Sequence, residues 1–167
     1  MRLAQGVAAA ELAQARALEQ AQHFGKGFAP VVARSVYRAD LVIPVMHWGW
    51  ENEPVANARQ RALARTMVAA GADAVIGGHP HVRQDIEIVH GKPVVYSVGN
   101  FVMKETDNAN QRLGWVLELN LDKRGVVSWR THTAAIDMEG IPTPAVVSSS
   151  PCGDRGQEKP GVCSAAP

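Results

Sequence analysis

Two short apolar runs, separated by a stretch with helical periodicity, constrain the fold of this chain more than any other feature. Residues 41–46 and 74–76 are apolar and short enough to be strands covered on both faces. Between them, residues 57–70 favour a helix with apolar side chains on one face and arginines on the other. The order strand, helix, strand predicts a βαβ unit with parallel strands, and therefore an α/β fold.

Histidines follow both predicted strands. His47 comes directly after the first strand, and His79 and His81 follow the second across a glycine pair. Because the carboxyl ends of parallel strands lie at one edge of a sheet, we expect the three imidazoles to meet there as metal ligands. The glycine pair allows a sharp turn, and Pro80 should restrict His79 to extended conformations. The alternative is a surface turn that happens to hold two histidines.

Aromatic and polar residues occupy the loops that leave these strands. Trp48, Trp50 and Glu51 follow His47 in a glycine-containing loop, the place where α/β sheets bind ligands. The tryptophans are also compatible with packing at the rim of the core, and Glu51 with the start of the next helix. Asn100 follows a glycine and is compatible with contacting a ligand or with capping a turn.

The chain after the second histidine loop favours antiparallel strands. Residues 86–97 alternate around a Gly-Lys turn, which is typical of a hairpin, and residues 113–121 and 126–135 form a second alternating pair. His90 is expected at the exposed hairpin turn and His132 as a half-buried residue of the last strand. Both are therefore interpreted as structural residues.

The composition divides the chain into three segments. Residues 1–33 are rich in helix formers and predict a helical segment, residues 34–141 hold the predicted α/β domain, and residues 142–167 predict a disordered Pro-, Gly- and Ser-rich tail. The tail contains Cys152 and Cys163, which are either free thiols or one small disulfide in an oxidising compartment. No histidine lies near them with the spacing of a zinc site.

Charge and hydropathy exclude several classes of function. The 167 residues are 46% hydrophobic, enough for a core, and the net charge of +1 leaves no electrostatic footprint for nucleic acid. No apolar run reaches the roughly 18 residues of a membrane span, and the N-terminus lacks the apolar core of a signal peptide. Taken as it stands, the chain is expected to be cytoplasmic.

Three blocks of sequence carry a resemblance to a known family. They are residues 40–51, residues 70–82 with the element Gly-His-Pro-His, and residues 96–101 with the sequence Tyr-Ser-Val-Gly-Asn-Phe. In this order they resemble the CapA family of capsule and poly-γ-glutamate synthesis proteins, which are related to calcineurin-like metallophosphoesterases, over residues 34–135. The resemblance implies the C-terminal half of an α+β sandwich, with a βαβ unit followed by antiparallel strands.

The resemblance also implies roles for single residues. His47 matches the isolated histidine ligand of the metallophosphoesterase pattern, and His79 and His81 match its terminal Gly-His-x-His element, with one histidine for each of two metals. Glu51 and Asn100 match positions characteristic of the CapA branch, which implies a catalytic, substrate-binding or supporting role. The implied cofactors are divalent metal ions, Mn, Zn, Fe or Mg.

The first half of the family pattern is missing before His47. A complete member resembling this chain carries Asp-x-His, Gly-Asp and Asn-His elements, whereas residues 1–39 contain no Asp and only one His, His23, in a helical context. Two divalent cations need a bridging carboxylate, and three neutral imidazoles cannot balance their charge. We therefore expect the chain alone to bind at most one transition metal, weakly, and to lack efficient hydrolase activity.

Two functions of different classes follow from the resemblance. The first is a truncated dimetal phosphoesterase-like hydrolase domain, and the alternative is a non-catalytic assembly or polymer-binding module of a capsule synthesis or export complex. An unrelated single-metal hydrolase would need Glu51 as general base. The implied partners are the capsule-synthesis machinery, the polymer and the missing N-terminal half of the fold. The implied location is membrane-associated, periplasmic or extracellular.

Overall fold

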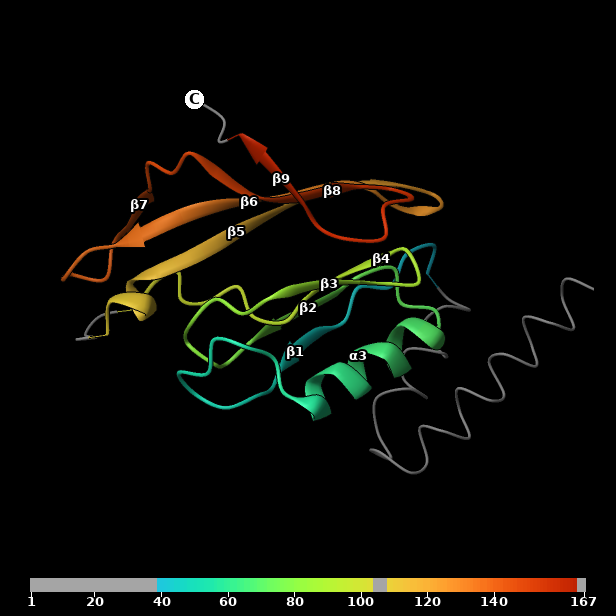
Figure 1. The fold of residues 1–167 in the computed structure, drawn as a ribbon, viewed down its shortest axis with the longest axis horizontal. Coiled ribbons are helices and arrows are strands. Elements are labelled where there is room, and N and C mark those ends of the chain that lie inside the picture. The colour runs from blue at the N-terminus through green and yellow to red at the C-terminus, as the bar shows by residue number, and fades with distance from the viewer. Residues whose placement is uncertain (1–38, 104–107, 165–167) are drawn as a thin grey trace, which may run out of the picture.

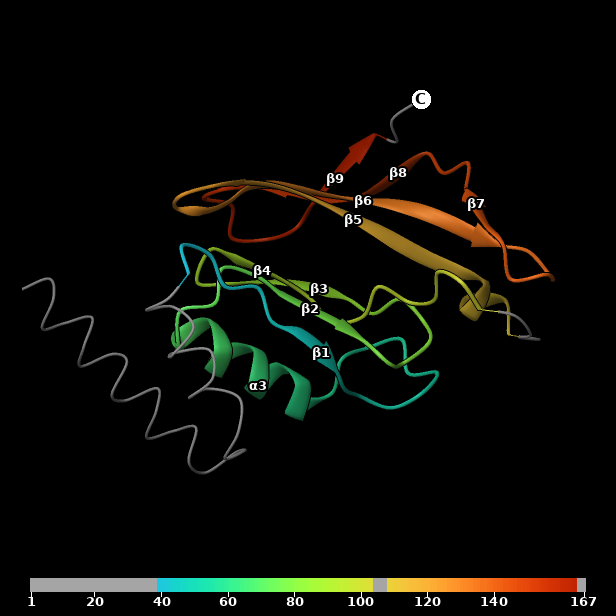
Figure 2. The same ribbon diagram turned by 180° about the vertical axis from the view of Figure 1, so that it is seen from behind.

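The computed structural model describes residues 39–103 and 108–164, which form three layers (Figures 1 and 2). Helix α3 (Ala58–Ala69) covers one face of a four-stranded sheet, and a five-stranded sheet lies across the other face. The predicted α/β class is therefore confirmed. The predicted helical segment 1–33 lies outside the described residues.

The first sheet joins the predicted βαβ unit to the predicted hairpin. Its strands are β1 (Val45–His47), β2 (Val75–Gly78), β3 (Ile86–Val89) and β4 (Lys92–Val95). They are arranged in the order β1-β2-β4-β3, with β1, β2 and β4 parallel and β3 antiparallel to β4. Both predictions are confirmed, and His90 lies exposed at the hairpin turn.

Helix α3 begins and ends as its sequence predicts. The side chain of Asn57 accepts a hydrogen bond from the backbone of Gln60, and the side chain of Gln60 accepts one from the backbone of Asn57. Gly71 follows the last turn with a φ of 106°, a conformation that glycine adopts without strain. Met67 and Val68 on the inward face pack against the first sheet, so the helix covers this face of it.

Strand β1 is an edge strand and is covered less than its sequence predicts. Pro44, which has no N–H, precedes it, as expected at an edge. Met46 is buried, but Val45 is 78% exposed and His47 is also exposed, so the prediction of a strand covered on both faces is wrong here. Within the described residues no strand pairs with the outer side of β1. Among the residues that the structure describes, the edge that carries His47 is therefore open.

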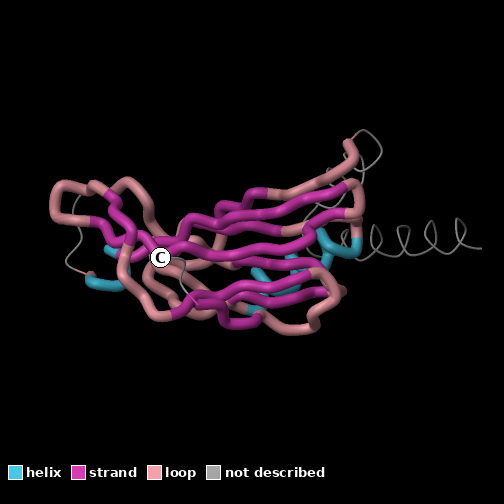
Figure 3. Tube along the Cα trace, turned by 90° about the horizontal axis from the view of Figure 1, so that it is seen from above, coloured by secondary structure: helices cyan, strands magenta, loops and turns pink. Residues whose placement is uncertain are grey.

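The second sheet is antiparallel. Figure 3 shows the domain from above, with the strands in magenta. A 3₁₀ turn, η1 (Ala109–Arg112), leads into β5 (Leu113–Asp122), β6 (Gly125–Ile136), β7 (Pro142–Pro144), β8 (Ser149–Asp154) and β9 (Gly161–Ser164). The order is β5-β6-β8-β9, with β7 paired to the end of β6. The pairing of β5 with β6 confirms the second predicted strand pair.

The predicted disordered tail is corrected by the structure. Residues 142–164 contribute three strands to the second sheet, and a disulfide joins Cys152 of β8 to Cys163 of β9 with a Cα–Cα distance of 5.8 Å. Arg155 donates to both carboxylate oxygens of Asp122, at 2.9 and 2.6 Å. The composition of this segment predicted disorder. The contacts that order it join residues far apart in the sequence, so they leave no local sequence pattern.

The two sheets meet through a small apolar cluster and a backbone connection. Trp129 and Val126 of the second sheet pack near Ala74, the residue directly before β2 of the first sheet. At the histidine end, the Val98 N–H donates to the Gly77 carbonyl at 3.0 Å, and the Val98 carbonyl accepts from the backbone of β5 at 2.7 Å. The segment around residues 98–100 is therefore fixed between the sheets. No helix in the described part of the chain has the length and apolar character needed to cross a membrane.

Candidate metal centre

The three histidines meet at the carboxyl ends of β1 and β2, as the βαβ unit predicts. His47 lies opposite Gly78, the last residue of β2, so that His79 follows directly beside it. The ring centroids of His47 and His79 are 4.3 Å apart, and those of His79 and His81 are 6.0 Å apart. Their proximity is thus confirmed, whereas metal binding by the three stays a prediction.

A carboxylate joins two of these histidines. Potential ligand atoms of Glu51, His79 and His81 all lie within 4.8 Å of one another, and His47 is not a member of this group. Two imidazoles and one carboxylate suit a transition metal such as Zn²⁺, Mn²⁺ or Fe²⁺ better than Mg²⁺, which prefers oxygen ligands. The residues present therefore fit one transition-metal ion. Glu51 lies in a loop, so its interpretation as a first-turn helix residue is wrong.

The backbone of the histidine turn differs from the prediction. Gly77 and Gly78 belong to β2 rather than to a turn. His79 has a φ of 98° and His81 a φ of 63°, so His79 is not extended as Pro80 alone would favour. Such conformations cost non-glycine residues about 1–3 kcal/mol each and cluster at functional sites. The surrounding contacts must therefore hold the turn against its local preference.

Gly77 is required by close packing behind the turn. A Cβ atom there would lie 2.1 Å from the carbonyl oxygen of Tyr96 and 2.3 Å from Nε1 of Trp48. These two atoms are themselves joined by a 2.8 Å hydrogen bond. At Gly78 the equivalent position has no heavy atom within 4 Å. The close approach at Gly77 is thus to the chain itself.

Asn100 orients one of the candidate ligands. Its Nδ2 donates to the carbonyl of Gln111 at 3.0 Å, which leaves its Oδ1 facing Nδ1 of His81 at 2.9 Å. Because Oδ1 is an acceptor, the contact requires the proton of His81 on Nδ1 and leaves Nε2 free for a metal. Asn100 thus contacts the predicted metal ligand His81, and its contact with a bound ligand stays a prediction. The backbone passes so close that a Cβ on Gly114 would lie 1.6 Å from the Asn100 carbonyl oxygen.

Buried amide side chains anchor the loop after β1, and the sequence did not single them out. Nε2 of Gln60 donates to Oε1 of Gln84 at 2.8 Å, and Nε2 of Gln84 donates to the Glu53 carbonyl at 2.9 Å. The Asn52 N–H donates to the carbonyl of Pro80 at 2.8 Å, which joins this loop to the histidine turn. The capping pattern at the start of α3 could have identified Gln60, whereas nothing local marks Gln84.

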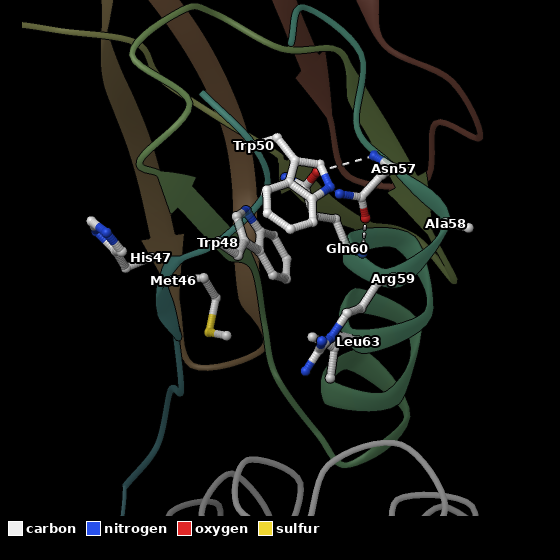
Figure 4. Close-up of a pocket in the computed structure, with 10 residues that line it drawn as sticks. Met46, His47, Trp48, Trp50, Asn57, Ala58, Arg59, Gln60 and Leu63 are labelled. Atoms are coloured by element: carbon white, nitrogen blue, oxygen red, sulfur yellow. Dashed lines mark hydrogen bonds between the residues drawn. The ribbon is translucent and has the colours of Figure 1, made fainter. Parts of the chain in front are cut away.

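The two tryptophans of this loop have different environments. Trp48 is buried, which confirms core packing for this residue. Trp50 is 72% exposed and, with Arg59 and Leu63, lines a groove of about 470 Å³ between β1 and the start of α3 (Figure 4). His47 also lines this groove. The groove therefore opens beside the histidines.

A charged cluster connects α3 to the β3 edge of the first sheet. Arg61 pairs with Asp85 and Glu87, and the Tyr96 hydroxyl donates to Glu87 at 2.7 Å. Burial and the hydrogen bond to Glu87 raise the pKa of Tyr96. Burial acts to raise the pKa of Glu87, but the hydrogen bonds from Tyr96 and Arg65 and the ion pairs outweigh it and lower that pKa. This cluster supports the sheet that carries the histidines.

The remaining histidines that the structure describes lie away from the site. His132 is half-buried on β6, as predicted, with its Nε2 2.9 Å from Glu118. His90 occupies the exposed turn between β3 and β4. His23 lies outside the described residues.

Comparison with known proteins gives a consistent set of relatives. The family model described as "Bacterial capsule synthesis protein PGA_cap" matches residues 6–105. The PGA biosynthesis protein CapA of Bacillus subtilis is 37% identical over 125 residues, which are 70% of this chain and 30% of that protein. The capsule biosynthesis protein CapA of Bacillus anthracis is 46% identical over 67 residues, 40% of this chain and 16% of that protein.

A more distant relative is a probable polyglutamine synthesis accessory protein of Mycobacterium tuberculosis, 36% identical over 63 residues, 38% of this chain and 17% of that protein. The chain thus spans less than a third of the length of the relatives named here. The matching segment contains both histidine loops and Asn100. The chain therefore belongs to the bacterial capsule synthesis protein PGA_cap family.

Proposed function

We propose that this domain supplies part of a divalent-metal site in a phosphoesterase-like hydrolase of capsule or poly-γ-glutamate synthesis. The observation that carries the proposal is the convergence of ligand atoms from Glu51, His79 and His81 within 4.8 Å. His47 lies against His79 and is proposed as a further ligand. Membership of a capsule-synthesis family supports the biological setting.

Each residue has its own role in the proposed site. The imidazoles of His79 and His81 hold the ion, Glu51 offers a carboxylate oxygen, and Asn100 fixes the ring of His81 through its Nδ1 proton. A bound divalent ion supplies Lewis acidity toward an ester or amide and activates water. His79 and His81 are both partly exposed just after the carboxyl end of β2, where a substrate would have access.

The proposed site needs more ligands than the described residues offer. Two ions about 3.5–4 Å apart require several ligands each, including a bridging carboxylate. We propose that additional family sequence provides them by docking along the open edge of β1, beside His47. The coverage of only 30% of the Bacillus subtilis relative supports this proposal.

Metal titration of the purified chain tests the proposal. Calorimetry with Mn²⁺ and Zn²⁺, combined with elemental analysis, should give at most one weakly bound ion per chain. His79→Ala and His81→Ala should each weaken binding at least roughly tenfold because each removes an imidazole ligand. His132→Ala, remote from the site, is the matched control and should bind like the wild type. Two tight sites on the isolated chain, or unchanged binding by His79→Ala, would contradict the proposal.

A non-catalytic binding module is the second candidate function. The exposed Trp50 in the groove with Arg59 favours it, because aromatic and cationic side chains bind polymers with acidic groups. The same His79→Ala change in the complete protein discriminates the two. Loss of metal together with loss of capsule output supports the hydrolase, whereas loss of metal with unchanged output supports the module.

We propose a membrane-associated or extracytoplasmic location for this domain. The disulfide between Cys152 and Cys163 supports it, because such bonds persist in oxidising compartments. Thiol titration of protein from fractionated cells, quenched with an alkylating agent, tests this location. Free thiols in the native protein would contradict it.

A further inference from the structure

Arg83 follows the histidine turn and carries a charge that no carboxylate neutralises within residues 39–103 and 108–164. Its guanidinium lies over the ring of Trp115, 5.3 Å from the ring centroid, and its side chain is half-buried. A partly desolvated cation without an anionic partner is costly, and binding of an external anion offsets that cost.

Arg61 shows what is missing at Arg83. Arg61 also lies over an aromatic ring, 5.0 Å from the centroid of Tyr96. Its guanidinium nitrogens are in addition bound by the carboxylates of Asp85 and Glu87. The guanidinium of Arg61 therefore has both an aromatic ring and carboxylate acceptors. The guanidinium of Arg83 has the ring, but its N–H donors have no acceptor among the described residues. A ligand with two oxygens has the geometry to fill this position.

Trp115 contributes a second unsatisfied donor to the same pair. Its Nε1 is buried and, of the buried side-chain polar atoms in the described part of the chain, is the one without a hydrogen-bond partner. Buried donors are normally satisfied, so an exception calls for an explanation. Both members of the stacked pair therefore have N–H groups with unused bonding capacity.

The stacked pair adjoins the candidate metal centre. A Cβ on Gly99 would lie 3.1 Å from Cγ of Arg83, so the arginine side chain runs directly along this residue. The next residue is Asn100, whose Oδ1 contacts His81. Trp115 is joined to the same segment, because its backbone N–H donates to the Val98 carbonyl at 2.7 Å. Arg83 and the metal centre therefore share the segment around residues 98–100.

We infer that Arg83, stacked on Trp115, binds an anionic oxygen group of the substrate beside the cluster of Glu51, His79 and His81. The inference rests on the proposed function, since that cluster is where the reacting bond would lie. A guanidinium binds carboxylate and phosphate in the same bidentate manner. The oxygen group is thus a carboxylate of an acidic polymer or a phosphate, and Arg83 selects anionic substrates.

Binding of two probes to the full chain tests the inference. γ-Linked glutamate oligomers and inorganic phosphate are titrated separately into the full chain at low salt in metal-free buffer, and binding is measured by calorimetry. Arg83→Gln should weaken binding of at least one probe by about tenfold or more, and Arg83→Lys should restore part of it. Arg130→Gln, a half-buried arginine paired opposite Glu118 in the second sheet, makes the same charge change and should remain within about twofold of the wild type.

The outcomes separate the source of the anion and the two proposals. Loss of oligomer binding identifies a carboxylate, and loss of phosphate binding identifies a phosphate. Binding of neither probe by the wild type, equal loss in Arg83→Gln and Arg130→Gln, or no loss in Arg83→Gln overturns the inference. If Arg83→Gln does not fold, Arg83→Lys must still weaken binding several-fold, because an ammonium lacks the planar fork. Metal titration of the same samples reports on the proposed function separately, and Arg83→Gln should retain wild-type metal affinity.

Discussion

The two sheets of this domain are stabilised in different ways. The second sheet has long antiparallel strands, a disulfide between β8 and β9 and a bidentate pair of Arg155 with Asp122. The first sheet has strands of three or four residues, and buried amides and ion pairs connect it to α3. The candidate ligands lie at or shortly after the carboxyl ends of β1 and β2 in the first sheet.

The difference shows that the backbone strain lies in the first sheet, at the histidine turn. His79 and His81 adopt positive φ angles. Gln60 and Gln84, whose side chains hold the loop after β1, are both only 2% exposed. Strained residues persist only where their surroundings over-determine them. The second sheet supplies part of these surroundings, since β5 is hydrogen bonded to the segment that carries Asn100. We therefore regard the second sheet as a rigid support for a locally strained site.

The largest expected effect comes from Gly77→Ala in the first sheet. Its Cβ would clash with the Tyr96 carbonyl and Trp48, so the free energy of unfolding should fall by about 3 kcal/mol or more. Denaturant unfolding measures this change. Gly78→Ala is the matched control, because its Cβ meets open space, and should change stability by less than about 1 kcal/mol. Equal effects of the two changes would show that the first sheet is not tightly packed behind the histidines.

Loss of the disulfide should weaken the second sheet while leaving the site intact. Cys152→Ser with Cys163→Ser opens a loop with a sequence separation of 11 residues, which should lower stability by about 2–3 kcal/mol. Metal affinity should remain that of the wild type, because neither cysteine contacts the first sheet's histidine edge. A parallel fall in metal affinity would show that the two sheets are energetically coupled, and would break the distinction drawn between them.

The parts of the fold that could be predicted are those that depend on local pattern. The apolar runs and the helix between them predicted a βαβ unit, and chain geometry alone then brought His47 to His79. The Asn57 cap of α3 is likewise a local signal. These features follow from residues within about 40 positions of one another, and short-range rules suffice for them.

The parts that could not be predicted depend on contacts between distant segments. Pro80 favours an extended His79, but the hydrogen bond from Asn52 to Pro80 and the packing behind Gly77 outweigh that preference. The Pro- and Gly-rich C-terminal segment resembles a disordered tail until it pairs with β6. Gln84 is buried because Gln60 and a loop carbonyl satisfy its amide, which no periodicity reveals.

Asn100→Ala tests whether the connection between the sheets serves the metal centre. Without the Oδ1 acceptor, His81 is free to shift its proton and its ring, so metal affinity should fall by roughly tenfold. Calorimetry with Zn²⁺ measures the change. Asn120→Ala, which removes an exposed hydrogen bond to Ser128 in the second sheet, is the control and should keep wild-type affinity. Unchanged affinity in Asn100→Ala would remove Asn100 from the proposed site.

The smallest expected effect is a pH dependence confined to the first sheet. Burial opposes ionisation of Glu87, but its hydrogen bonds and ion pairs outweigh this effect and lower its pKa in the folded protein. The ionised Glu87 therefore stabilises the fold fully above the pKa that Glu87 has in the unfolded chain. This stabilisation is lost as the pH falls through the lower pKa of the folded state. Glu87→Gln should therefore reduce the loss of stability on acidification by less than about 1 kcal/mol, because solvent and salt screen this partly exposed cluster. Glu139→Gln, an exposed carboxylate without an ion pair in the described residues, should keep the wild-type pH profile. Unfolding curves at several pH values distinguish the two, and identical profiles for both variants would mean that the ion pairs of α3 add nothing to the stability of the first sheet.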